Sequence, residues 1–156
     1  SYGIQVIIEG HLTGTYLDGA AMRGADETPI IALTLRYDRI DNFWFVLLHE
    51  LGHVVKHLYS GSSEFFDDLD SSANTDVKEL EADDFAQESL IPKDKWKRSP
   101  VRFFATESAI RKQAENWNIS EAIVAGRVRR ENNDWTSPEL AKLVGQGKVR
   151  HLFEGS

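Results

Sequence analysis

The sequence contains no cysteine in its 156 residues. Disulfide bonds and thiolate metal sites are therefore excluded, so any zinc site must rest on histidine and carboxylate side chains, the ligands typical of catalytic zinc. The sequence also lacks an apolar run that approaches the roughly eighteen residues of a membrane-spanning helix. Its N-terminal segment lacks the basic and then apolar pattern of a secretory signal. We therefore expect a cytoplasmic protein with no membrane partner.

Basic side chains are scarce in the first part of the chain. Residues 1–95 carry 7 basic and 18 acidic side chains, whereas residues 96–156 carry 11 and 7. The acidic part repels phosphates, and the basic residues of the second part are spread out rather than gathered on one face. The sequence begins at Ser1 rather than at methionine, which is compatible with a missing upstream domain. We expect any DNA binding to come from such a domain.

The most specific pattern in the sequence is His49-Glu50-Leu51-Gly52-His53. On a helix, residues i and i+4 lie on one face, about 6 Å apart along the axis, so His49 and His53 can hold one metal ion between them. Glu50 can then reach a water on the open position of that metal. The pattern predicts a zinc hydrolase with Glu50 as its catalytic base.

Residues 41–58, which contain this pattern, are predicted to form a buried central helix with Asp41 as its cap. The alternative to a metal site is a pair of core histidines that are satisfied by hydrogen bonds. His57 lies about 12 Å along the helix axis from His49, so we expect it to be an outer neighbour of the site or a surface residue.

Three segments before this helix are predicted strands. They are residues 4–8, a passage between residues 10 and 20 that is followed by a turn at Gly19 or Gly24, and residues 28–35, which begin at Pro29. The predicted fold class is α+β, with a small three-stranded antiparallel sheet packed on the central metal-binding helix and a helical C-terminal part.

A second helix is predicted to follow a loop at residues 59–75, starting at Asp76 and stopping before Pro92. Glu79 falls on the apolar stripe of this helix, where an unpaired carboxylate is costly unless a cation meets it. Glu79 is therefore the candidate third metal ligand. Asp83 is the candidate acceptor of a hydrogen bond from a metal-ligating histidine. Two alternatives stay open: Glu79 closes a capping box with Asp76, or Glu81 is the ligand.

The rest of the chain is predicted to be helical, at residues 106–117, at residues 120–130 with Ser120 as cap, and in a short helix that opens at residues 136–139. The pattern favours a packing module over DNA contact by Arg127, Arg129 and Arg130. The residues expected to point inward are Ile110, Ala114, Trp117, Ile123, Val124 and Val128.

The histidine motif, the run Glu79-Leu80-Glu81-Ala82-Asp83-Asp84-Phe85-Ala86 and the following Leu90-Ile91-Pro92 together resemble the ImmA/IrrE family of zinc metallo-endopeptidases over residues 29–92. The resemblance implies a minimal thermolysin-like zincin with zinc as cofactor. It implies His49, His53 and Glu79 as ligands, Glu50 as base, and a Glu-x-x-x-Asp pattern that ends at Asp83. Within one compact domain, we expect a zinc peptidase core at residues 1–95 and a helical C-terminal subdomain packed on it at residues 96–156.

Members of this family often cleave helix-turn-helix repressors of mobile elements and stress genes. The predicted function is therefore a zinc-dependent endopeptidase that acts on a regulatory protein, with a repressor or antitoxin as partner. The alternative is a non-catalytic, zinc-stabilised regulatory module of a toxin-antitoxin or phage-type transcription regulator. An intact Glu50 favours the enzyme, because a structural site needs no base beside an open coordination position. Candidate donors to the oxyanion are His11, Tyr16, Arg36 and Tyr37.

Overall fold

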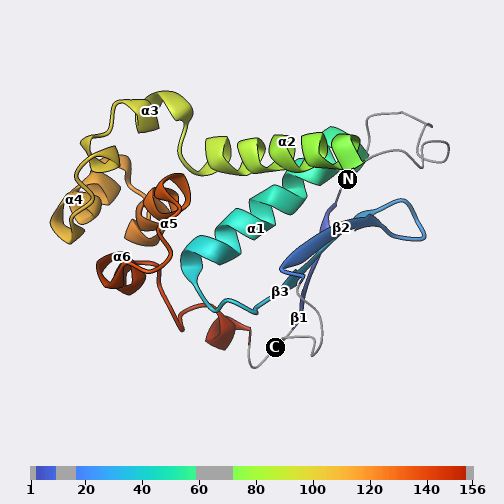
Figure 1. Cartoon of the computed structure of the whole chain (residues 1–156). Helices are drawn as coiled ribbons and strands as arrows, with labels where there is room; N and C mark the ends of the chain where they lie inside the picture. The colour runs from blue at the N-terminus through green and yellow to red at the C-terminus, as the bar shows by residue number, and fades with distance from the viewer. Residues whose placement is uncertain (1–2, 10–16, 59–71, 154–156) are drawn as a thin grey trace.

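A computed structural model describes residues 3–9, 17–58 and 72–153. A small sheet lies at one end of the long helix α1, and the C-terminal helices gather at its other end (Figure 1). The strands are β1 (Gln5–Glu9), β2 (Gly19–Arg23) and β3 (Pro29–Thr34), in the order β1-β3-β2. The α+β fold class is confirmed.

The prediction that the sheet is purely antiparallel is wrong for one of its two strand pairs. β2 and β3 are antiparallel, because a tight turn joins them, in which the amide of Gly24 donates to the carbonyl of Thr28 over 2.8 Å. β1 takes the other edge of β3 and runs parallel to it, with Gln5 opposite Ile30. A strand's own residue pattern does not encode its pairing partner, so the short connections suggested hairpins throughout.

The apolar core between the sheet and α1 (Ile40–His53) is built from both elements. Ile31 and Leu33 of β3 are 1% and 2% exposed, and they pack with Val54, which follows α1. Partly buried side chains of α1 complete this cluster, namely Phe43, Val46, Leu47 and Leu51. One sheet face therefore covers the helix that carries the histidine motif.

The helix α2 (Ser72–Leu90) packs along α1 (Figure 1). The two backbones meet at Gly52, where an added Cβ would lie 3.1 Å from the Cα of Ala82 and 3.2 Å from the Cβ of Phe85. Ala82 is completely buried. Small residues at this contact let the two helices approach closely, so the side chains one turn away on each helix face one another.

The helix boundaries differ from those predicted at three points. α1 begins at Ile40 after Arg39, and Asp41 lies in its first turn instead of capping it. A π-helical turn, η1 (Val54–Leu58), replaces the last turn of α-helix. α2 begins at Ser72 rather than at Asp76, because residues 72–75 contain no glycine or proline that would stop a helix. Asp76 therefore lies inside the helix, and the capping-box alternative for Glu79 is wrong.

The C-terminal part contains α3 (Lys93–Lys97), η2 (Pro100–Arg102), α4 (Glu107–Trp117), α5 (Glu121–Asn132), α6 (Pro138–Leu143) and η3 (Arg150–Leu152). The predicted cap of α5 is confirmed, since the Ser120 hydroxyl accepts from the amide of Ala122 over 3.2 Å. Residues of α4, α5 and α6 form a second apolar core that contains the side chains predicted to point inward. The division of the chain at residue 95 stays a prediction. Among the described residues, no helix has both the length and the apolar character to cross a membrane.

Candidate metal centre

Three side chains from two helices converge at the middle of the α1–α2 contact. The Nε2 atoms of His49 and His53 lie 3.1 Å apart. One carboxylate oxygen of Glu79 lies 3.2 Å from Nε2 of His49, and the other lies 3.3 Å from Nε2 of His53. Among the described residues, these three form the group of histidine and acidic side chains that can hold a metal ion.

The spacing of these donor atoms fits zinc. A tetrahedral zinc ion with bonds of about 2.0 to 2.1 Å separates its ligand atoms by roughly 3.3 Å. This is close to the separation of the two imidazole nitrogens and to the distance from each nitrogen to its nearer oxygen of Glu79. Two imidazole nitrogens and one carboxylate also form a ligand set of catalytic zinc sites. The three side chains therefore fit the ion in both chemistry and separation.

Glu81, the alternative ligand, faces a different partner. Its carboxylate lies 3.6 Å from Nε2 of His57, and its side chain is half exposed. Glu79 and Glu81 are two residues apart on α2, so they leave the helix in directions that differ by about 200°. The structure thus brings Glu79 to the histidine pair and places Glu81 beside His57.

Asp83 orients the first histidine of the motif. Its carboxylate accepts a hydrogen bond of 2.8 Å from Nδ1 of His49, which leaves Nε2 of that ring free to face Glu79 and His53. Such outer carboxylates fix the tautomer of a ligating histidine and raise its basicity.

The Asp83→Asn variant is expected to bind zinc roughly 10- to 100-fold more weakly, because the amide cannot give the same anchor to His49. A competition titration with a chromogenic chelator measures this loss. Asp84→Asn is the matched control on the same helix, since Asp84 pairs with Lys93 on the surface. Equal zinc affinity in the wild type and in Asp83→Asn would remove Asp83 from the site.

The two histidines differ in basicity, for identifiable reasons. Burial lowers the pKa of His49, but the hydrogen bond and charge of Asp83, together with the charges of Glu50 and Glu79, outweigh burial and raise the pKa overall. Burial also lowers the pKa of His53, helped by the neighbouring charges of His49 and His57 and opposed by Glu79. A lowered pKa keeps His53 neutral at physiological pH, the state in which an imidazole binds a metal.

Glu50 lies beside the group but does not belong to it. Its side chain is 7% exposed, and burial raises its pKa. Gly19, at the start of β2, covers it so closely that an added Cβ would lie 2.9 Å from the Oε1 atom of Glu50. A carboxylate whose pKa is raised towards neutrality is suited to accept a proton and return it. β2 therefore holds in place the residue predicted to be the base.

A cleft of about 550 Å³ opens next to this group. His49, Glu50 and Asp83 line it, and so does Tyr37, one of the candidate oxyanion donors. Arg36 contacts the Tyr37 ring, with its guanidinium carbon 4.9 Å from the ring centroid. The candidates His11 and Tyr16 lie outside the described residues.

The cleft is also lined by residues that the sequence did not point to as part of the site, namely Arg39, Asn42, Arg129, Arg130 and Trp135. The arginines of α5 were interpreted from sequence only as packing residues or as phosphate contacts. Their position depends on how α5 docks against α1, which no local pattern encodes.

Comparison with protein-family models gives a match to Peptidase_M78, the IrrE N-terminal-like domain, over residues 2–129. A search of the curated proteins gave no match. The matched residues include the whole sheet and the helices α1 and α2, on which His49, Glu50, His53 and Glu79 lie. The resemblance found in the two motifs is therefore confirmed over most of the chain, and the protein belongs to the Peptidase_M78 family of IrrE N-terminal-like domains.

Proposed function

We propose that this protein is a zinc-dependent endopeptidase that hydrolyses a peptide bond of a regulatory protein, such as a helix-turn-helix repressor. The observation that carries the proposal is the convergence of His49, His53 and Glu79 within 3.3 Å of one another, with the buried Glu50 beside them. Membership of a metallopeptidase family supports the reaction class. The choice of a repressor rests on what members of the family often cleave.

Each residue of the site has a distinct task in this reaction. His49, His53 and Glu79 would hold the zinc, and Asp83 would keep the ring of His49 in the ligating orientation. A bound zinc would supply a Lewis acid that makes water more acidic and polarises the scissile carbonyl. Glu50 would take the proton from the attacking water and deliver it to the leaving amine.

The reaction is tested by incubating the zinc-loaded protein with purified helix-turn-helix repressors and searching for new N-termini by mass spectrometry. We expect a defined new N-terminus that disappears when a zinc chelator is added and returns when zinc is restored. If the zinc-loaded protein cleaves no repressor, the alternative gains support, in which the site stabilises a non-catalytic module of a toxin-antitoxin or phage-type regulator.

The protein is expected not to bind DNA at submicromolar concentration and near-physiological salt. Arg129 is 4% exposed, Arg127 lies 3.7 Å from Glu131, and Arg130 lines the cleft, so the three arginines of α5 do not lie together on one outward recognition face. Few counterions could then be released on binding. A fluorescence-anisotropy titration with labelled duplex DNA checks this, and tight, salt-sensitive binding would contradict it.

A further inference from the structure

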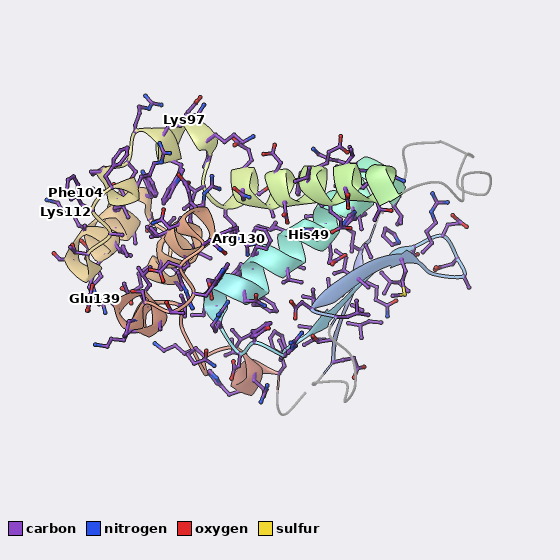
Figure 2. The ribbon with its side chains drawn as sticks, viewed as in Figure 1. His49, Lys97, Phe104, Lys112, Arg130 and Glu139 are labelled. Atoms are coloured by element: carbon purple, nitrogen blue, oxygen red, sulfur yellow. The ribbon has the colours of Figure 1, made fainter. Side chains whose placement is uncertain are left out.

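The cleft beside the metal centre has a cationic wall, formed by Arg39, Arg129 and Arg130. Figure 2 shows Arg130 on the edge of α5 that faces α1, the helix that carries His49. The wall comes from two separate parts of the chain, the start of α1 and the end of α5. It therefore exists only when α5 is docked on α1.

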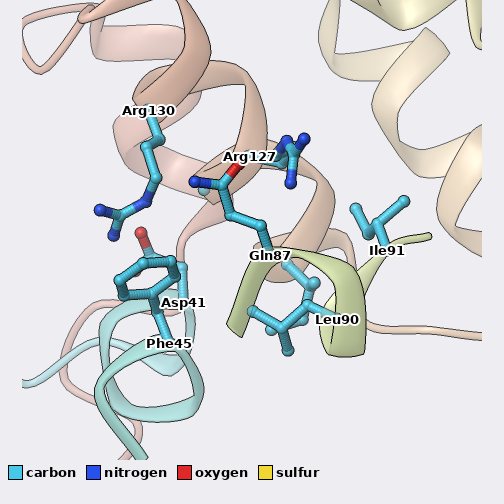
Figure 3. Close-up of a pocket in the computed structure, with 9 residues that line it drawn as sticks. Asp41, Phe45, Gln87, Leu90, Ile91, Arg127 and Arg130 are labelled. Carbon is cyan, nitrogen blue, oxygen red and sulfur yellow. The ribbon is translucent and has the colours of Figure 1, made fainter. Parts of the chain in front are cut away.

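Arg130 is held by an aromatic ring rather than by an acid. Its guanidinium carbon lies 3.3 Å from the centroid of the Phe45 ring and 5.9 Å from that of Trp135. Figure 3 shows its side chain reaching from α5 towards Phe45 and Asp41 of α1. Among the described residues, no carboxylate lies within ion-pair distance of this guanidinium. Cation–π contact fixes the position of an arginine while leaving its N–H donors available.

The other two arginines are anchored in different ways. One terminal nitrogen of Arg129 donates to the carbonyl of Trp135 over 2.8 Å, while its Nε is buried with no hydrogen-bond partner. Arg39 donates from Nε to the carboxylate of Asp41 over 3.1 Å. Burial lowers the pKa of Arg129 and of Arg130, and the neighbouring charge of Arg39 adds to this lowering. The charges of Asp83 and Asp41 oppose it at Arg130.

The acids around the wall have other partners. Asp83 accepts the hydrogen bond of His49, and Asp134 accepts from the amides of Thr136 and Ser137. Asp41 is 7% exposed, and its carboxylate accepts the hydrogen bond of Arg39. Among the described residues, Asp41 is thus the carboxylate in hydrogen-bond contact with this wall, through Arg39, while Asp83 and Asp41 act on Arg130 only through their charge. The guanidinium of Arg130 keeps its N–H donors for a ligand.

We propose that this wall is a specificity subsite that binds a carboxylate of the substrate, with Arg130 as its main donor. The inference rests on the proposed peptidase function and deepens it by naming the substrate class: a peptide with a carboxylate close to the scissile bond. An arginine fork binds a carboxylate through two parallel hydrogen bonds, and Trp135 offers an apolar side to the stem of the same residue. The carboxylate belongs either to an Asp or Glu side chain or to a free C-terminus.

The test uses short alanine-based peptide hydroxamates, because a hydroxamate binds active-site zinc whatever its sequence. One series of peptides carries the hydroxamate at its N-terminal end, and a second series carries it at its C-terminal end. Within each series, a single Glu or a single Gln is placed at each position in turn. At one position, the Glu compound should bind the zinc-loaded protein roughly 10- to 100-fold more tightly than its Gln partner, the strength of a charged hydrogen bond. Matched free-acid and amide termini distinguish a side-chain carboxylate from a C-terminal one.

The variants assign this preference to Arg130. Arg130→Gln should abolish the discrimination while it keeps the zinc affinity, and Arg130→Glu should reverse the preference towards a Lys compound. Arg111→Gln, on the surface of α4, is the matched control and should bind like the wild type. A loss of stability could weaken binding but could not reverse the preference from Glu to Lys. The melting temperature of each variant shows whether it is folded.

The outcomes distinguish a failure of the carboxylate subsite from a failure of the metal centre. Tight binding of every hydroxamate with no preference for Glu would overturn the subsite and leave the peptidase intact. Absence of binding by all hydroxamates would overturn the metal centre and the subsite together. A preference that survives in Arg130→Gln would place the carboxylate site elsewhere.

Discussion

Replacing Glu50 with glutamine is expected to lower the turnover of a protein substrate by roughly 10² to 10⁴, the usual contribution of a general base. The amide is nearly the same size as the carboxylate, so it fills the space beneath Gly19 without the clash that a larger side chain would cause. It cannot accept a proton. The rate is measured as the appearance of the new N-terminus under single-turnover conditions.

Two controls make this result specific to chemistry. The zinc content and the melting temperature of Glu50→Gln should match those of the wild type, because Glu50 is not one of the three converging ligands. Its affinity for the hydroxamates should persist as well. Undiminished cleavage by Glu50→Gln would mean that another group acts as the base.

Replacing Glu79 with alanine is expected to weaken zinc binding more than the roughly 10- to 100-fold predicted for Asp83→Asn, since a ligand is lost rather than its support. The Glu79 side chain is about half exposed, and alanine favours helix, so α2 should stay folded. Zinc content is measured by mass spectrometry after dialysis against a weak chelator.

Glu81→Ala is the matched control, because it removes the same side chain two residues away, with a similar exposure. It should retain the zinc. Loss of zinc in Glu81→Ala alone would transfer the ligand role to Glu81. Equal occupancy in the wild type and in Glu79→Ala would show that the metal is held in another way.

The metal centre could be predicted from sequence because helix periodicity determines most of it. His49 and His53 are four residues apart, so any helix places them on one face. Glu79 and Asp83 repeat that spacing on α2, and both turn towards α1 because the apolar stripe of α2 must face it. A pattern that repeats along one helix predicts which side chains share a face.

The features that could not be predicted depend on contacts between distant segments. The parallel pairing of β1 with β3 follows from tertiary packing, which overrides local signals. Arg129 and Arg130 gave only a weak sequence signal, a basic cluster diluted by acids. Their role at the cleft depends on α5 approaching α1 so closely that a Cβ on Gly126 would lie 2.6 Å from that of Asp41.

The backbone contact between Gly52 and Ala82 determines more than the fit of two helices. Gly52 lies between the two histidines on α1, and Ala82 lies between Glu79 and Asp83 on α2, so the contact sits at the centre of the candidate ligand set. Helices that touch through backbone atoms resist rocking, so this contact would hold the ligand atoms at a fixed separation. The reorganisation energy of metal uptake is then small. Affinity for the metal should therefore depend on two residues that never touch it.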